Sequence, residues 1–207
     1  MAMAQLGNGL FSADHHEESL SVREAELSLV RRLGDAAPEK ASVFLELNVM
    51  SNIASSYQRL GRLDEALPLR RDVYFAYLRL HGEEHMNTFL VAENYALVLL
   101  DLQRFKEAKR LLRKSTSVAQ RVLGASHAVT LKMRSTYAGA LHEDPAATLD
   151  DLREAVTTLE EIEPSARRVL GGAHPTTKVI EYDLPKARAA LAARESPPSE
   201  LDEVEDA

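Results

Sequence analysis

The sequence predicts an all-α protein, a right-handed α-solenoid of stacked antiparallel helix pairs with about eight helices and no strands. One observation is a fixed period, because Ala96 lies 42 residues after Ala54 and 42 before Ala138. A second is that apolar residues inside each unit recur at helical spacings of three and four. A third is a recurring order of Gly, His and Thr, in Gly82, His85 and Thr88, in Gly124, His127 and Thr130, and in Gly171, His174 and Thr177. Such a period is typical of stacked helix pairs.

The N-terminal part is expected to begin part-way through a repeat. Leu6-Gly7 followed by Phe11 predicts the turn between two paired helices. The next helix, at about 15–33, is expected to end at Leu33-Gly34, because glycine supplies the left-handed position that follows many helices. Two complete pairs then follow, with helices at about 39–60 and 63–80, and at about 86–102 and 105–123.

The third pair, at about 128–142 and 146–170, is longer than the others. Its extra residues lie in HEDPAATLDD, where Asp144 is the expected N-cap and Pro145 the first helical position. Pro164 predicts a kink or break in the second helix, because proline removes one backbone hydrogen bond. A terminal helix at about 175–193 has Pro185 where the earlier repeats have a small residue, and it is expected to cap the array.

The expected organisation therefore has three parts. A repeat domain at 15–194 lies between an N-terminal segment at 1–14, which starts a partial repeat, and a disordered acidic tail at 195–207. The domain divides into a half repeat at 15–37, repeats at 38–84, 85–126 and 127–173, and a capping helix at 174–194. Small residues are expected where paired helices come close, at Ala54, Ala96 and Ala138 against Ala66, Ala108 and Ala155.

Composition limits the class of protein. The formal net charge is −7, but six acids without a base lie in the last segment, ESPPSELDEVEDA, so the remainder is nearly neutral. Such a body has no broad field to attract nucleic acid. No run approaches the roughly 20 apolar residues of a membrane span. Cysteine is absent, which excludes disulfides and thiol nucleophiles. We expect a cytoplasmic protein without nucleic-acid binding or membrane insertion.

The repeated segments carry a family resemblance. They read VLGASHAVTLKMRSTYAGAL and VLGGAHPTTKVIEYDL in one part of the unit, and LGRLDEALPLR and LQRFKEAKRLLRK in the other. Together they resemble the tetratricopeptide repeats of kinesin light chain, whose unit of the same length reads LGxxHPxTxxxxNNLAxxLxxxGxxxEAxxLxxxAL. The resemblance covers roughly residues 6–190, and the proline of LGxxHP survives only as Pro175. It implies a concave groove, lined by the inner helices, that binds an extended peptide or a partner helix.

The resemblance places Asn52 and Asn94 on this groove, at the second Asn of the NNLA motif. An Asn amide both donates and accepts, so it can pair with the backbone of any extended peptide. The equivalent positions later in the chain hold Thr136 and Asp183. The alternative is that these amides tie adjacent helices together. The expected groove residues are Asn48, Ser51, Asn52, Ser55, Arg59, Leu90, Glu93, Asn94, Leu97, Lys132, Ser135 and Thr136.

A basic stripe is expected on the helix at 105–123. It consists of Lys106, Lys109, Arg110, Arg113 and Lys114. It is a candidate site for an acidic partner or for the chain's own acidic tail. The alternative is an ordinary solvated face.

No constellation of catalytic or metal-binding residues stands out. The run Asp14-His15-His16-Glu17-Glu18 is not expected to bind metal, because adjacent residues of a helix point in different directions. The recurring His85, His127 and His174 are most simply helix-start or packing groups. We therefore expect no enzyme, no cofactor and no metal.

The expected function is that of a non-catalytic adaptor or scaffold that binds a peptide segment of a partner protein in the groove. The alternative is a structural subunit or assembly factor built permanently into a larger complex, which would use end or convex surfaces and bury more apolar area.

Overall fold

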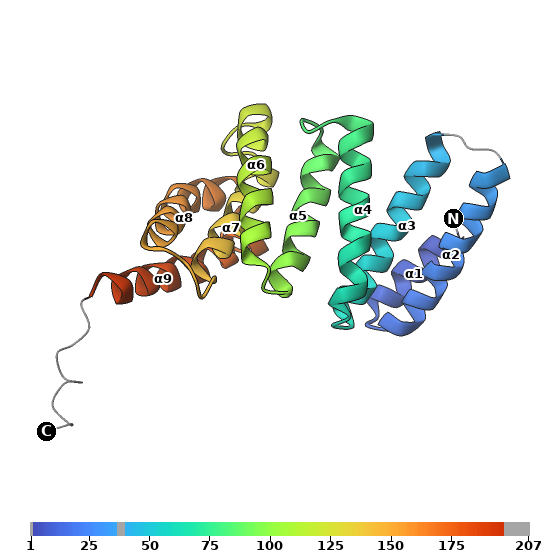
Figure 1. The fold of residues 1–207 in the computed structure, drawn as a ribbon, viewed down its shortest axis with the longest axis horizontal. Coiled ribbons are helices and arrows are strands. Elements are labelled where there is room, and N and C mark those ends of the chain that lie inside the picture. Colours follow the sequence, from blue (N-terminus) through green and yellow to red (C-terminus); the bar gives the residue numbers. More distant parts are fainter. Residues whose placement is uncertain (1, 37–39, 197–207) are drawn as a thin grey trace, which may run out of the picture. The chain divides into compact units, whose positions relative to one another are not determined.

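A computed structural model describes residues 2–36 and 40–196, and every regular element in this part of the chain is a helix. The helices (Figure 1) are α1 Ala2–Ser12, α2 His16–Ala36, α3 Lys40–Arg59, α4 Leu63–His81, α5 Met86–Asp101, α6 Phe105–Leu123, α7 Ala128–His142, α8 Leu149–Leu170 and α9 Pro175–Glu195. The all-α prediction is confirmed. The predicted disordered tail lies outside the described residues from 197 onward.

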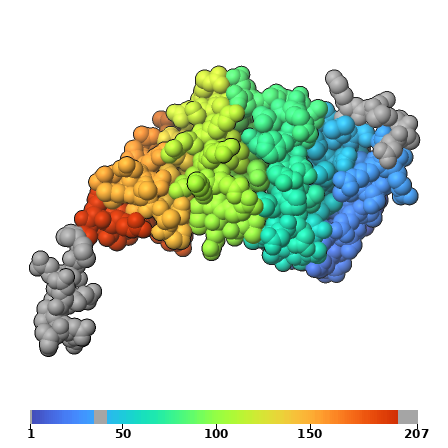
Figure 2. Space-filling model, in the orientation of Figure 1, coloured from blue at the N-terminus to red at the C-terminus, as the bar shows by residue number. Residues whose placement is uncertain are grey.

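The chain forms two compact units, residues 1–107 and 108–207, with the division inside α6. Figure 2 colours the first unit from blue to green and the second from green to red. In the first unit each helix from α1 to α4 packs on the next one, so that the series ends at α5. In the second unit α7 packs on α8, α8 packs on α9, and α9 also contacts α7. Consecutive packing of this kind is what stacked helix pairs require.

The core of the first unit has two clusters that share α3. One side of α3 gives Leu47 and Met50, which pack against residues of α4. Another side gives Val49 and Ile53, which pack against residues of α2. The partners are Val73, Ala76 and Tyr77 on α4, and Leu20 and Val30 on α2. Because α3 is apolar on two sides, it holds its two neighbours at once.

The core of the second unit is built from three helices. Large, fully buried side chains of these helices are Leu131, Met133 and Leu141 of α7, Leu159 and Ile162 of α8, and Ile180 of α9. Complete burial of one such side chain contributes about 1.5–3 kcal/mol. This packing fixes α9, which has no following helix in the described chain.

The alanines that were predicted at close contacts between helices are buried. All six, Ala54, Ala66, Ala96, Ala108, Ala138 and Ala155, are 0% exposed. A larger side chain at any of them would displace the neighbouring helix, and overpacking of this kind destabilises by about 1–3 kcal/mol.

The recurring Gly and His residues form the turn that leads into α5, α7 and α9. Gly82, Gly124 and Gly171 have positive φ angles of 81°, 91° and 88°, a conformation that side chains disfavour. Each following histidine is an N-cap, and its Nδ1 accepts the backbone N–H two residues later, at 3.1 Å for His85 and 3.2 Å for His127 and His174. The prediction that these histidines start helices is confirmed.

The prediction of a turn at Leu6-Gly7 is wrong, because α1 runs through it. Gly7 is buried, and a Cβ atom there would lie 3.2 Å from Cγ of Arg23. Its carbonyl accepts a hydrogen bond of 2.8 Å from Ser19 Oγ. The glycine therefore permits close approach of α1 and α2 instead of a turn. For the same reason the chain has one helix more than expected among the described residues.

Gly34 likewise does not end its helix. Helix α2 continues to Ala36, and a Cβ atom on Gly34 would lie only 2.6 Å from Ser42 Oγ. This glycine too marks a close approach between neighbouring segments.

The predicted start of α8 is also wrong. Thr148 is the N-cap, and its Oγ1 accepts from Asp151 N at 3.1 Å while Asp151 Oδ2 accepts from Thr148 N at 3.1 Å. This reciprocal pair satisfies two backbone donors, which a cap at Asp144 could not do. Asp144 instead accepts from Ala146 N at 2.9 Å within the preceding turn.

The break that Pro164 predicts does not occur, since α8 is one helix from Leu149 to Leu170. Proline removes a single backbone bond. On either side of it Ile162 and Ala166 are completely buried, so packing holds the helix together.

We predict that His127→Ala lowers the free energy of unfolding by about 1 kcal/mol, because the N-cap acceptor of α7 is lost. His127→Asn should stay within about 0.5 kcal/mol of the parent, since the Asn oxygen can accept the same N–H. Urea unfolding followed by circular dichroism measures both. Equal losses in the two variants would contradict the capping role.

Candidate partner-binding surface

The two asparagines of the predicted groove lie on α3 and α5 of the first unit. Both are partly exposed. The backbone carbonyl of Asn52 accepts a 2.8 Å hydrogen bond from Arg23, but the side-chain amides of Asn52 and Asn94 take part in no hydrogen bond of the described residues. The alternative that these amides tie adjacent helices together therefore has no contact in its favour.

The serines of the predicted groove are held by Arg70 of α4. Its Nη1 donates to Ser51 O and Oγ at 3.2 and 3.0 Å, and its Nη2 donates to Ser55 Oγ at 2.9 Å. Nε and Nη2 also donate to Gln58 Oε1 at 3.0 and 2.7 Å. These five bonds use the five donors of a guanidinium. Ser51 and Ser55 thus join α3 to α4.

Arg70 is 5% exposed, and this burial lowers its pKa to about 10. All its acceptors are neutral oxygens, so hydrogen bonds rather than a carboxylate stabilise the charge. Sequence reasoning missed this residue. The available signal was an arginine four residues after the buried Ala66, inside the apolar stripe of its helix.

Arg23 makes a similar connection nearer the N-terminus. Its guanidinium donates to Ser56 Oγ at 2.6 Å and to Asn8 Oδ1 at 3.1 Å, and it lies 4.8 Å from the ring centre of Phe11. Burial lowers the pKa of Arg23. This side chain joins α1, α2 and α3, which positions the start of the inner face.

Other predicted groove residues of the first unit differ in exposure. Asn48 and Leu90 are exposed and Leu97 is half-buried, whereas Glu93 is buried. Arg59 is exposed, and its guanidinium lies 3.6 Å from the carboxylate of Asp14. The burial of Glu93 does not favour direct peptide contact through its side chain.

Helix α7 carries the predicted groove residues of the second unit. Lys132 is exposed and Thr136 is half-buried, with its Oγ1 donating to Lys132 O at 3.1 Å. Ser135 is buried. Exposed positions are therefore fewer here than on α3.

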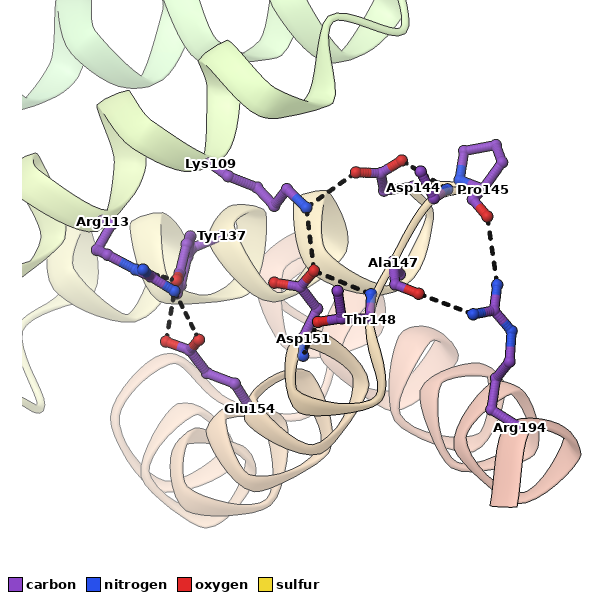
Figure 3. Close-up of polar contacts among 11 residues, drawn as sticks. Lys109, Arg113, Tyr137, Asp144, Pro145, Ala147, Thr148, Asp151, Glu154 and Arg194 are labelled. Atoms are coloured by element: carbon purple, nitrogen blue, oxygen red, sulfur yellow. Dashed lines mark hydrogen bonds and ion pairs between the residues drawn. The ribbon is translucent and has the colours of Figure 1, made fainter. Parts of the chain in front are cut away.

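Two residues of the basic stripe bind acids of their own unit (Figure 3). Lys109 Nζ lies 2.9 Å from Asp144 Oδ2 and 3.3 Å from Asp151 Oδ2. Arg113 donates to Tyr137 Oη at 2.7 Å and to Glu154 Oε2 at 2.8 Å. Lys106, Arg110 and Lys114 are exposed. These ion pairs tie α6 to α7, α8 and the turn between them.

The charges of this network shift one another's pKa. Burial opposes the ionised form of Lys109, but hydrogen bonds to Asp144 and Asp151 raise its pKa overall. Burial also opposes ionised Asp151, but hydrogen bonds from Thr148 and Lys109 lower its pKa overall. Burial and the neighbouring Glu154 raise the pKa of Tyr137 to about 12, so its hydroxyl stays protonated and donates to Glu154 at 2.9 Å.

The turn between α7 and α8 is held from a second side by α9. Arg194 Nη1 donates to Ala147 O at 2.9 Å and Nη2 donates to Pro145 O at 3.3 Å (Figure 3). This contact joins residues that are far apart in sequence, which is why the sequence alone did not reveal it.

The comparison with protein families decides the identity of the repeats. The sequence profile of the family described as Tetratricopeptide repeat matches residues 45–121, from α3 into α6. Residues 45–121 are therefore similar to tetratricopeptide repeats. Repeats of this kind indicate a protein–protein interaction scaffold.

The fold is of the kinesin light chain-like type. Two crystal structures from Podosopora anserina, described as putative kinesin light chain nearly identical TPR-like repeats, have TM-scores of 0.74 and 0.72 to this repeat protein. They are 18% and 19% identical, and the match covers 93% of this chain and 86% and 87% of theirs. BtubC (BKLC) from P. vanneervenii has a TM-score of 0.61 at 15% identity, covering 95% of this chain and 81% of its own.

A search of curated proteins found no sequence match. Within the described residues, no helix of the repeat protein has the length and apolar character needed to cross a membrane.

We predict that Lys109→Met lowers the free energy of unfolding by about 2 kcal/mol at neutral pH, because hydrogen bonds between charged groups contribute about 1.5–3 kcal/mol. Because the pKa of Asp151 is lowered in the folded protein, the stability that its ionised form contributes is present at neutral pH. This contribution is lost as the pH falls through the folded-state pKa. Because the pKa of Lys109 is raised in the folded protein, the stability that its charged form contributes is lost as the pH rises through the folded-state pKa. Urea unfolding from acid to alkaline pH should show the largest difference from the parent between about pH 4 and 10.

The matched control is Arg110→Met, one residue further along α6 and exposed. It should change stability by less than about 0.5 kcal/mol. Equal effects at the two positions, or a Lys109→Met difference that grows below pH 3, would exclude the ion pair as the cause.

Proposed function

We propose that this repeat protein is a non-catalytic adaptor that holds a peptide segment of a partner protein against its inner helices α3 and α5. The observation that carries the proposal is the pair Asn52 and Asn94. They occupy equivalent positions one repeat apart and are partly exposed. Among the described residues, neither side-chain amide makes a hydrogen bond. Both can therefore donate to and accept from the backbone of an extended peptide.

The surroundings of the asparagines support this function. Gln58 Nε2 of α3 donates to Asp101 Oδ2 of α5 at 3.3 Å, so the two inner helices are connected directly. Asn48 and Leu90 are exposed on the same two helices, and Leu97 is half-buried. Polar amides beside apolar side chains suit a peptide that presents backbone and side chains alternately. Lys132, Ser135 and Thr136 remain predicted groove residues of α7.

The mechanism is rigid presentation. Arg70 fixes Ser51 and Ser55 against α4, and Arg23 fixes the backbone at Asn52. The adaptor therefore loses little conformational freedom on binding, and the ordering cost falls on the peptide. Backbone recognition by amides gives affinity, and neighbouring side chains give selectivity.

The second candidate is a structural subunit of a larger complex, and one observation favours it. The terminal helix α9 exposes Tyr182 by 62% and Val179 by 48%. A built-in subunit would cover such residues with a partner in fixed stoichiometry.

We predict that the double variant Asn52→Ala, Asn94→Ala weakens peptide binding by about 5- to 150-fold, because two neutral hydrogen bonds contribute about 1–3 kcal/mol together. Peptides would first be selected from a displayed library on the full-length parent protein. Fluorescence anisotropy with a selected peptide then gives the dissociation constants.

The control is Gln120→Ala, which removes an exposed amide from the outer helix α6. It should bind like the parent. Circular dichroism establishes that all three proteins are equally folded. Parent-like affinity in the folded double variant would reject the asparagine-lined surface as the binding site. The structural-subunit function would be favoured if the parent captured a complex of fixed stoichiometry from native extract and only the Tyr182→Ser variant failed to do so.

A further inference from the structure

A buried histidine at the end of α7 lacks a partner for one ring nitrogen. The side chain of His142 is only 4% exposed. In the described part of the chain, its Nε2 is buried and makes no hydrogen bond. An unsatisfied buried polar atom of this kind destabilises a fold by about 1–3 kcal/mol. A ligand that coordinates or bonds to Nε2 would remove this penalty.

A carboxylate of α9 faces this nitrogen. Asp183 Oδ1 lies 4.0 Å from His142 Nε2, and the Asp183 side chain is 8% exposed. This separation is too long for a hydrogen bond. Ligand atoms of a tetrahedral zinc site lie about 3.4 Å apart when each metal–ligand distance is about 2.1 Å, so a small side-chain movement would bring these two atoms to the required separation.

A second carboxylate completes a cluster of three. Glu143 follows His142 directly and is the C-cap residue of α7. The ligand atoms of His142, Glu143 and Asp183 all lie within 4.8 Å of one another. Glu143 is exposed, so an ion can reach the cluster from solvent on that side.

We propose that His142, Glu143 and Asp183 bind a divalent first-row transition-metal ion such as Zn²⁺. One imidazole nitrogen with two carboxylate oxygens is a donor set of zinc sites, whereas Mg²⁺ and Ca²⁺ prefer oxygen alone. A divalent ion would also neutralise the two carboxylates. Three protein ligands leave a position for water or for a side chain of another protein.

The competing cation at this place is Lys186, one turn after Asp183 on α9. Its Nζ lies 3.9 Å from the ring centre of Tyr182. A hydrogen bond with Tyr182 and the charges of Asp183 and Glu143 raise its pKa. Lys186 is exposed, and no ion pair of the described residues joins it to either carboxylate, so it can move away from an entering ion.

The site would join the end of α7 to the middle of α9. This position was an expected groove position, equivalent to those of Asn52 and Asn94, and it holds Asp183 instead. The substitution places a metal-binding side chain where the earlier repeats have an amide. The proposal revises the expectation of a protein without metal and does not depend on peptide binding.

The test is isothermal titration of the full-length, chelator-treated protein with Zn²⁺, together with thermal unfolding. The parent should bind one zinc ion and unfold at a higher temperature when zinc is present, and the same concentration of Mg²⁺ should give neither effect. Glu143→Gln and Asp183→Asn should each weaken zinc affinity by about tenfold or more. Because Glu143 is exposed, its variant keeps the fold and the test remains informative if Asp183→Asn is unstable.

The matched control is His15→Gln, which removes an exposed histidine of the first unit. It should bind zinc like the parent. Replacing Zn²⁺ by Co²⁺ gives a visible absorption band that reports ligand geometry and should be lost in Glu143→Gln. Absence of binding by the parent, parent-like affinity in Glu143→Gln, or an equal response to Mg²⁺ would each overturn the proposal.

Discussion

The fold depends on a turn in which one glycine and one histidine act together. Glycine reverses the chain at a positive φ angle, and Nδ1 of the histidine three residues later accepts the backbone N–H of the second residue of the next helix. A helix begun at a fixed residue presents its apolar face in a fixed direction. The alanines of each helix are then buried, because the turn sets which face of the helix points into the core.

The two units hold their helices together by different electrostatic interactions. In the first unit Arg23 and Arg70 are buried among neutral oxygens. In the second unit Lys109 and Arg113 of α6 pair with carboxylates of α8. Salt screens ion pairs more strongly than it affects hydrogen bonds to neutral groups. We therefore expect added salt to weaken the second unit more than the first.

Much of the fold could be predicted because it repeats. Patterns that occur several times in register predict the repeat period, the helical secondary structure, the glycine turns and the positions of the buried alanines. The errors fall where a residue acts only once. Gly7 resembles a turn residue locally, but the distant Arg23 explains it. Asp144 has the right chemistry for a cap, but Thr148 and Asp151 satisfy two donors together.

The candidate site was less predictable for the same reason. The family resemblance predicts the positions of the asparagines. It does not reveal that the hydroxyl groups of Ser51 and Ser55 accept hydrogen bonds from Arg70 of another helix. Likewise, nothing in the local sequence brings His142 to Asp183, because only the packing of α9 on α7 does so. Contacts between distant segments decide which polar residues are available to a ligand.

The turn between α7 and α8 affects the susceptibility of this protein to proteolysis. As the longest connection between helices in the second unit, it would ordinarily be the first place to be cleaved. Arg194 binds two of its carbonyl groups and Lys109 binds its Asp144, so the backbone is held on both sides. A protease must draw the cleaved segment into an extended form, which here requires these contacts to open first. Shortening α9 before Arg194 would thus create a cleavage site more than forty residues away along the chain.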